Sequence, residues 1–332
     1  MYVRRFSTAE GSGVEIFAPA KVNLFLEVLG KRADGYHELE TLLAAVNIGD
    51  TLRFTPQKQG ELQLRCEWSG GLAAWQRRRS TQLAEAGESP FGDLPTGDKN
   101  LAYRAAKLVQ QRSGTTLGAQ ILLIKRIPSA AGLGGASSDA AATIVAANLV
   151  WNLGWSLEQM TAVAAELGSD IPFFLHGPAA VCRGRGERME RVSASRLHLV
   201  VVRPPVGLST PRVFSHCRPV TQPRGVQALQ AAYASGRSHE IGPELFNRLE
   251  EPAQELTPWI QQLKNAFAKL QVRSCQMTGS GSSCFGICHS ARHARRVAGC
   301  LRGMNVGVVY QTTTLVPIEG SKRWISPRFA SS

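Results

Sequence analysis

Residues 128–142 read PSAAGLGGASSDAAA, a glycine-rich loop that runs directly into a helix of small residues. Gly132, Gly134 and Gly135 allow the loop to curl and its backbone to approach a ligand closely. We expect the helix over about 137–149, and the first turn of a helix carries unpaired N–H groups and a partial positive charge that attract phosphate. The stretch therefore fits a phosphate-binding loop.

The loop alone leaves two interpretations open. It is not a Walker A motif, because G-x-x-x-x-G-K-[ST] has no match here, and it is not the dinucleotide fingerprint. Ser137 and Ser138 could supply hydroxyls to phosphate oxygens or to a metal ion, whereas Asp139 is expected to point away from a bound anion. On glycine spacing alone, phosphate binding and a plain strand-to-helix turn are equally favoured.

The amino-acid composition is that of a globular protein but does not by itself indicate a function. The chain has 332 residues, 43% of them hydrophobic, which suits one large or two ordinary domains. Residues 1–13 lack the apolar core of a signal peptide, so we expect a disordered leader on a cytoplasmic protein. The net charge of +13 fits nucleic acid, an anionic surface or phosphorylated ligands, but the basic residues are dispersed. The seven cysteines have no metal-finger spacing and are expected to be reduced thiols, most of them in the core.

Hydrophobic periodicity predicts a mixture of strands and helices, with a soft domain boundary near residue 190. Residues 69–99 carry no sustained period and are interpreted as an irregular excursion. The strand at 197–202 and the last five elements together suggest a split βαβ arrangement. Strands are predicted at 14–27 with a break at Pro19, and at 52–54, 61–68, 119–124, 178–182, 197–202, 274–277, 284–287 and 306–313; helices are predicted at 101–111, 137–149, 156–166, 257–270 and 292–301.

Two further segments change the interpretation of the loop. PAKVNLFLEVLGKRADGYHELETL, residues 19–42, places Lys21, Asn23, Tyr36 and His37 around strand edges and a turn. MTGSGSSCFG, residues 277–286, is a second glycine-rich turn between apolar strands. Each segment alone has an ordinary structural explanation, but the three in this order are far more specific.

The three segments together resemble the signature of the GHMP kinase superfamily, small-molecule kinases with a glycine-rich phosphate loop. Within it the chain is most similar to the branch that phosphorylates a methylerythritol unit attached to cytidine diphosphate. The stretches GSDIPFFLHGPAAVCRGRGE (168–187) and LFNRLE (245–250) support that narrower resemblance. The likeness covers about residues 17–317, and the excursion at 69–99 looks longer than the family's usual connection.

The resemblance implies an α+β fold of two domains with the active site in the cleft between them. Residues 1–190 should resemble domain 2 of ribosomal protein S5 and bind ATP, with an insertion at about 69–99, and residues 191–332 should be ferredoxin-like. The implied reaction transfers the γ-phosphate of ATP to a tertiary hydroxyl of cytidine diphosphate methylerythritol, a step of non-mevalonate isoprenoid biosynthesis. Mg²⁺ would be bound mainly through the ATP phosphates. The resemblance implies a small-molecule substrate as the partner and neither nucleic acid nor a membrane. It also implies that the protein is a monomer or a homodimer.

The family's catalytic aspartate corresponds to Asp170, which we expect to act as the general base. Lys21 should lie against it, keep the carboxylate ionised and balance developing charge. Without the resemblance, Asp170 would be interpreted as a turn or capping residue and Lys21 as a surface lysine.

The resemblance also implies binding residues on both sides of the cleft. Asn100 is expected near the adenine, although a helix N-cap explains it equally well. Tyr36, His37 and, opposite Tyr36, Phe214 are expected to hold the cytidine, because an aromatic ring stacks on a pyrimidine. The remaining expected ATP-binding residues are Pro128, Ala130, Gly132, Leu133, Gly134, Gly135, Ala136, Ser137 and Ser138; the remaining substrate-binding residues are Asn23, Thr210, Gly279, Ser280 and Gly281.

Two departures from the family concern charge, and one of them is that the turn with Arg183 and Arg185 is more basic than usual. Asp139 stands where the family often has an amide, and Arg183 and Arg185 are expected to offset its negative charge. The insertion precedes Asn100 and is therefore hypothesised to border the nucleotide mouth.

Three alternatives remain beside this interpretation. A GHMP kinase for homoserine or mevalonate would leave Tyr36 and His37 without a purpose. A nucleic-acid-binding protein would need a basic face with interleaved aromatic residues, and aromatics are only 7% of the chain. A kinase relic serving as a binding module is disfavoured because Lys21 and Asp170 are both present.

Overall fold

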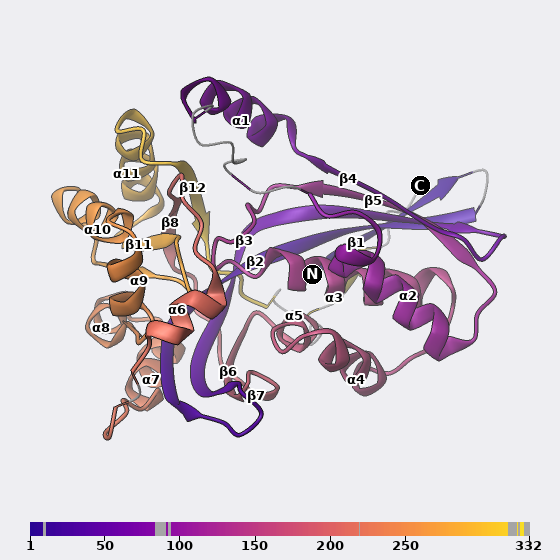
Figure 1. Ribbon diagram of the computed structural model, residues 1–332, viewed down its shortest axis with the longest axis horizontal. Coiled ribbons are helices and arrows are strands. Elements are labelled where there is room, and N and C mark those ends of the chain that lie inside the picture. The colour runs from indigo at the N-terminus through magenta and orange to yellow at the C-terminus, as the bar shows by residue number, and fades with distance from the viewer. Residues whose placement is uncertain are drawn as a thin grey trace.

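A computed structural model describes residues 1–8, 11–83, 91, 94–218, 220–317, 324 and 326–328 (Figure 1). The strands are β1 (Tyr2–Thr8), β2 (Gly11–Lys31), β3 (His37–Gln57), β4 (Leu62–Trp68), β5 (Gly118–Lys125), β6 (Ala179–Gly184), β7 (Arg188–Arg191), β8 (His198–Arg203), β9 (Phe246–Asn247), β10 (Ser274–Met277), β11 (Cys284–Cys288), β12 (Val308–Thr313) and β13 (Ser326–Arg328). The helices are α1 (Gly70–Leu83), α2 (Leu101–Ser113), α3 (Gly135–Val150), α4 (Leu157–Leu167), α5 (Ile171–His176), α6 (Thr210–His216), α7 (Gln227–Ser235), α8 (Ser238–Glu244), α9 (Glu250–Leu256), α10 (Trp259–Lys269) and α11 (Ala291–Gly303), with a 3₁₀ turn at Gly97–Lys99.

The larger sheet is built around two long strands. Its main path runs β13-β1-β2-β3-β5-β4, while β6 and β7 continue from the other end of β3 and β9 pairs with β2. Helices α2, α3, α4 and α5 lie in a layer on one face of this sheet (Figure 1). Helix α3 is buried on every side between Ser138 and Ala147, which its alanine-rich sequence permits because small side chains let neighbouring elements approach closely.

The smaller sheet has four antiparallel strands in the order β12-β8-β11-β10. Numbered along the chain, this order is 4-1-3-2, the ferredoxin-like arrangement, and the predicted α+β fold is confirmed. Alternate residues of β8 face different cores: Leu199 and Val201 pack with residues of β2 and β3, whereas Val200 and Val202 pack under α10 and α11. The smaller sheet is therefore sandwiched between the larger sheet and its own helices (Figure 1).

The N-terminal prediction was wrong. Residues 2–8, expected in a disordered leader, form β1 and pair antiparallel with β2. Met1 and Val3 are each 2% exposed and belong to the main core. Because only these two side chains face inward, the segment lacks the sustained alternation by which a strand is recognised.

The predicted break at Pro19 is also wrong. β2 continues through it, and the pairing with β3 shifts register between Pro19 and Ala20. A bulge accommodates proline inside a sheet because the missing N–H need not join the ladder.

The excursion at 69–99 is less irregular than predicted. It begins with the 14-residue helix α1 and ends with the 3₁₀ turn before α2, while residues 84–90 and 92–93 lie outside the described residues. The predicted domain boundary near residue 190 falls within β7, near its end, and stays a prediction.

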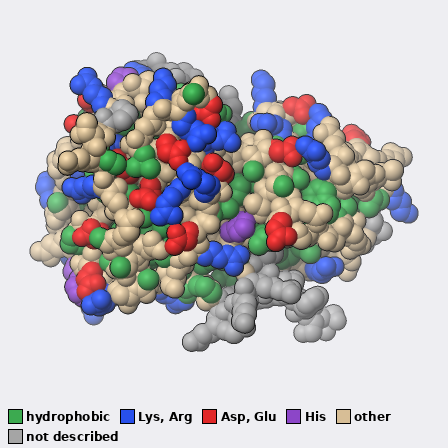
Figure 2. Space-filling model, turned by 90° about the horizontal axis from the view of Figure 1, so that it is seen from below, with side chains coloured by type: hydrophobic (Ala, Val, Ile, Leu, Met, Phe, Trp, Pro, Cys, Tyr) green, Lys and Arg blue, Asp and Glu red, His purple; other side chains and the backbone are tan. Residues whose placement is uncertain are grey.

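Charged side chains are dispersed on one face of the molecule. On the face drawn in Figure 2, Lys and Arg side chains are interspersed with Asp and Glu and form no continuous basic stripe. No helix in the described ranges is long and apolar enough to cross a membrane.

Candidate active site

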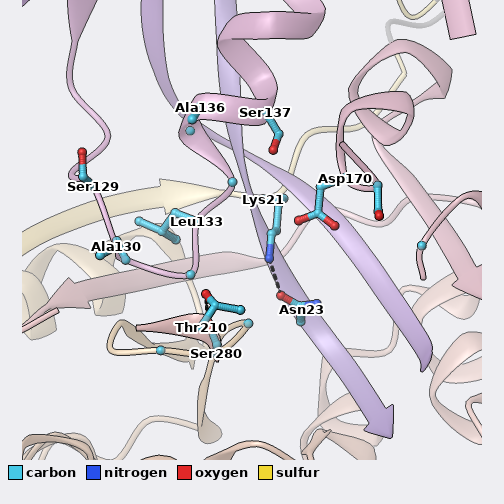
Figure 3. Close-up of a pocket in the computed structure, with 18 of the residues that line it drawn as sticks. Lys21, Asn23, Ser129, Ala130, Leu133, Ala136, Ser137, Asp170, Thr210 and Ser280 are labelled. Carbon is cyan, nitrogen blue, oxygen red and sulfur yellow. Dashed lines mark hydrogen bonds between the residues drawn. The ribbon is translucent and has the colours of Figure 1, made fainter. Parts of the chain in front are cut away.

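A cavity of about 880 Å³ lies where the glycine-rich loop, the middle of β2 and the turn after β10 meet (Figure 3). It gathers segments that are more than 250 residues apart in sequence, such as Lys21 and Ser280. All predicted site residues but one line it: Lys21, Asn23, Tyr36, His37, Asn100, Pro128, Ala130, residues 132–137, Asp170, Thr210, Phe214 and residues 279–281.

Ser138 is the exception. Its side chain is fully buried and its hydroxyl has no hydrogen-bond partner among the described residues. Ser137 lies one position earlier at the start of α3, and its hydroxyl faces the part of the cavity where Lys21 and Asp170 lie (Figure 3). Of the two serines, the geometry therefore leaves only Ser137 for a ligand.

The glycine-rich loop is fixed from two sides. The Lys21 amide donates to the Leu133 carbonyl at 3.0 Å, and the Thr278 hydroxyl donates to the Gly132 carbonyl at 3.2 Å. Gly132 has φ +70°, and a Cβ there would lie 2.1 Å from the Thr278 carbonyl oxygen. Glycine at this position is thus required both by backbone conformation and by the close approach of the turn after β10.

Lys21 is buried inside the cavity wall, and its Nζ donates to Asn23 Oδ1 at 2.7 Å (Figure 3). Burial lowers the pKa of Lys21, and the nearby negative charge of Asp170 opposes that effect. The expected direct contact is not formed: no ion pair joins Lys21 and Asp170 in the described part of the chain. The two side chains instead face the same part of the cavity (Figure 3).

Asp170 immediately precedes α5, the position of an N-cap, yet its side chain caps nothing there. Its backbone is already helical, so the carboxylate does not turn back to the first N–H groups of the helix. Asp170 thus lies in a turn but does not cap the helix, and its carboxylate is directed into the cavity (Figure 3).

Asn23 is held by two threonines that the sequence analysis did not identify. Its side-chain Nδ2 donates to Thr41 Oγ1 at 2.9 Å, and its backbone N–H donates to Thr278 Oγ1 at 3.0 Å. Thr41 Oγ1 in turn donates to the Phe25 carbonyl. Thr278 stands inside the quoted second glycine-rich turn and was the more recognisable of the two. Both fix the amide whose oxygen orients Lys21.

The turn after β10 and the start of α6 form the opposite wall. The hydroxyls of Thr210 and Ser280 lie 2.7 Å apart, and Asn247 donates to the carbonyl of Gly279 at 2.9 Å (Figure 3). The segment LFNRLE, which supported the family resemblance, therefore holds this wall in place.

The aromatic residues near the cavity include one ring pair. The rings of His37 and Phe214 lie 4.8 Å apart, tilted by 30°, so Phe214 packs on His37, and the cytidine sandwich with Tyr36 stays a prediction. Tyr36 is 55% exposed, with the guanidinium of Arg185 5.0 Å from its ring centre. Burial, and then Lys31, lowers the pKa of His37, which favours its neutral form.

Asn100 is both a helix cap and a residue of the cavity, while its place near the adenine stays a prediction. Its side chain caps α2 by accepting from the Ala102 amide at 2.9 Å, and it also lines the cavity. Leu94, Pro95 and Lys99 line the cavity beside it, so the end of the insertion borders the site.

A buried charge cluster lies beneath the loop. Lys125 Nζ donates to Asp50 and to Asp139, and Lys125 and Asp139 also line the cavity, so the expectation that Asp139 points away from a bound anion stays a prediction. Burial, with the Asp50 charge, raises the pKa of Asp139, while the two carboxylates outweigh burial and raise the pKa of Lys125. Arg183 and Arg185 do not offset Asp139, contrary to expectation: Arg183 pairs with Glu40 and Glu190. Lys125 was missed because a lysine ending an apolar strand resembles a surface residue.

Bound Mg²⁺ would have few protein ligands. In the described ranges no three His, Cys, Asp or Glu side chains are grouped to hold a metal ion. The residues that line the cavity fit an ion held mainly by phosphate oxygens, and the Ser137 hydroxyl is a further oxygen donor in the cavity.

Comparisons with known proteins match this geometry. The N-terminal GHMP kinase domain matches residues 100–178 and the C-terminal one residues 227–306. The 4-diphosphocytidyl-2-C-methyl-D-erythritol kinase of Pelotomaculum thermopropionicum is 39% identical over 87% of this chain and 94% of its own length. The enzyme of the same name from Synechococcus sp. (strain CC9311) is 38% identical over 82% of this chain and 86% of its own.

Solved structures agree. A crystal structure titled 4-(cytidine 5'-diphospho)-2C-methyl-D-erythritol kinase is 36% identical, covers 91% of this chain and 99% of its own, and superposes with a TM-score of 0.74. Homoserine kinase from Cytophaga hutchinsonii covers 94% of this chain and 97% of its own with a TM-score of 0.69 at 18% identity, which shows the fold alone. This chain belongs to the 4-diphosphocytidyl-2-C-methyl-D-erythritol kinases, a family of GHMP kinases.

Proposed function

We propose that this chain transfers the γ-phosphoryl group of ATP to the tertiary hydroxyl of 4-diphosphocytidyl-2-C-methyl-D-erythritol, in the non-mevalonate pathway to isoprenoid precursors. One observation carries the proposal: Lys21, Asn23 and Asp170 face one cavity that is also bordered by the glycine-rich loop. A general base, a buried cation and a phosphate cradle are the parts that phosphoryl transfer to an alcohol needs.

The attacking group is the substrate's own hydroxyl. Asp170 accepts the proton of this hydroxyl as its oxygen forms a bond to the γ-phosphorus, and the bond from that phosphorus to the bridging β–γ oxygen breaks to release ADP. Lys21 stabilises the negative charge on the transferred group, and Asn23 holds its ammonium in position at 2.7 Å. Burial strengthens both effects because little water screens the charges.

The loop binds the triphosphate. The N–H groups at the start of α3, together with the Ser137 hydroxyl, lie where they can donate to phosphate oxygens. Mg²⁺, held mainly by those oxygens, would neutralise part of the phosphate charge. Pro128, Ala130 and residues 132–136 form the loop wall, and Asn100 borders the nucleotide side.

The acceptor occupies the other end of the cavity. His37 and Phe214 present a joined aromatic surface, and exposed Tyr36 can move onto a pyrimidine ring. Thr210 and residues 279–281 line the wall next to the transferred group. Homoserine and mevalonate have no nucleobase to occupy this aromatic end, so we expect both to be poor acceptors.

The test is ADP release by purified protein with Mg²⁺–ATP and each of three acceptors: the cytidine diphosphate methylerythritol compound, homoserine and mevalonate. The proposal expects turnover with the cytidine compound only. Turnover with homoserine or mevalonate instead would overturn the acceptor assignment but leave the kinase chemistry in place. The cytoplasmic location and the monomeric or homodimeric state stay predictions.

A further inference from the structure

An aromatic cluster joins the insertion to both sheets. Trp68 comes from β4 of the larger sheet, and Val308 and Tyr310 come from β12 of the smaller one. Leu72 and Trp75 of α1, together with Phe91, fill the space between them. We call these six residues the aromatic clasp. Figure 1 shows α1 beyond the end of β4, on the side of the molecule that carries β12 and α11.

Phe91 is the centre of the clasp. It is 1% exposed, its ring stacks on Trp75 at 4.9 Å between centres, and it meets Trp68 at 5.5 Å. A buried aromatic residue with two ring neighbours fixes the surfaces that it contacts, because side chains in such a core have little freedom.

Arg203 lies against Phe91 and is an unusual residue to bury. Its guanidinium carbon is 5.7 Å from the Phe91 ring centre, and the residue is 2% exposed. Burial lowers its pKa to about 10, which still leaves a cation at neutral pH. No carboxylate pairs with it among the described residues, and its Nε has no partner there. Nη1 donates to the Pro204 carbonyl at 2.6 Å and Nη2 to the Ser129 carbonyl at 3.5 Å.

Tyr310 makes a parallel contact. Its hydroxyl donates to the Arg126 carbonyl at 2.8 Å. Arg126 and Ser129 stand on either side of Pro128, the first residue of the glycine-rich loop. Both donors therefore come from the smaller sheet, and both hold the point at which the loop leaves β5. Tyr310 belongs to the clasp, and Arg203 contacts it through Phe91.

We propose that the aromatic clasp positions the glycine-rich loop for ATP, with Phe91, Arg203 and Tyr310 as positioning residues. None of the three lines the cavity, so each acts through the carbonyls of Arg126 and Ser129 rather than on the nucleotide. This inference rests on the proposed function only in taking ATP as the ligand; it needs no particular acceptor.

The cleanest variant is Tyr310→Phe, which removes one hydroxyl and keeps the ring in the clasp. The measurement is the ATP dissociation constant by calorimetry without acceptor, together with the KM for ATP and kcat. Loss of one hydrogen bond of this kind predicts ATP affinity about 2- to 10-fold weaker, with kcat changed less than the KM. Tyr103→Phe on α2, outside the clasp and the cavity, is the matched control and should bind ATP as the wild type does.

Phe91→Leu and Arg203→Lys test whether the effect travels through the clasp. Each should weaken ATP binding, and the loss of affinity in the double variant should be smaller than the product of the two single losses, because Phe91 contacts Arg203 and acts through its hydrogen bond to the Ser129 carbonyl. A purely structural role would lower the unfolding free energy but leave ATP affinity and the KM for ATP unchanged.

The outcomes separate the two proposals. If the wild-type protein and the Tyr310→Phe variant bind ATP with equal affinity, only the clasp proposal is overturned. If the wild-type protein binds ATP but does not turn over the cytidine acceptor, the acceptor assignment is overturned. The clasp proposal is then still decided by the ATP affinity of the Tyr310→Phe variant. Wild-type protein that binds no ATP overturns both.

Discussion

Substituting Gly132 by alanine tests whether the glycine-rich loop and the turn after β10 form one rigid site. The residue has φ +70°, which costs a non-glycine residue about 1–2 kcal/mol. The new Cβ would also lie 2.1 Å from the Thr278 carbonyl oxygen, whereas 3.0 Å is the closest approach that real Cβ atoms make. The loop or the turn must therefore retreat by at least about 0.9 Å.

Gly154→Ala is the matched control. Gly154 has φ +67° and no neighbouring atom within 4 Å of a Cβ, so it carries the same backbone strain without the clash. Both variants should lose a similar free energy of unfolding from that strain. Only Gly132→Ala should also lose activity, and a displacement of about 1 Å near the reacting groups predicts a kcat/KM lower by on the order of 10²-fold.

The assays are urea unfolding for stability and initial rates of ADP release at varied ATP. If Gly132→Ala keeps a kcat/KM within about threefold of Gly154→Ala, the tight apposition of loop and turn is not needed for catalysis. The reasoning from the 2.1 Å approach would then be refuted.

Three further predictions follow from the charged groups. Burial lowers the pKa of Lys21, although Asp170 opposes the shift, so kcat/KM should fall as pH rises through this lowered pKa, at a lower pH than for an ordinary lysine. The Lys21→Arg variant stays charged and should not show this fall in kcat/KM at alkaline pH, even if its rate is lower. Lys125→Met should reduce the free energy of unfolding by about 3–5 kcal/mol, measured with urea, because it leaves two buried carboxylates facing each other. The pKa of Glu27 is lowered: burial opposes the shift, but hydrogen bonds from Arg248 and two backbone amides outweigh it. Its stabilisation is therefore present above the ordinary pKa of 4.5 and lost as pH falls through the lower folded value, so Glu27→Gln should flatten the acid side of a stability–pH curve.

Much of the site could be predicted because its residues cluster in three short segments. The loop at 128–138, the segment from Lys21 to His37 and the turn at 279–281 each keep their spacing, so a resemblance carries their positions directly. Ser138 shows the limit of that method, since sequence gives adjacency but not which of two serines a helix turns inward.

What could not be predicted depends on contacts between distant residues. β1 forms because it pairs with β2 and buries Met1 in the core. The sequence of residues 1–13 alone shows neither the pairing strand nor the core that covers Met1. Arg203 and Tyr310 lie 74 and 184 residues along the chain from their acceptors Ser129 and Arg126, and the insertion that packs on them has no periodic pattern of its own. Tertiary packing, rather than local propensity, decides such elements.

The central claim is that Asp170 accepts the proton of the attacking hydroxyl while Lys21 carries the charge of the transferred group. The most direct measurement is the kcat of Asp170→Asn with the cytidine diphosphate methylerythritol acceptor, beside the dissociation constants of ATP and acceptor for the same variant. The account predicts a kcat lower by about 10²–10⁴-fold with both dissociation constants nearly unchanged. A variant that turns over within about tenfold of the wild type would show that Asp170 is not the base.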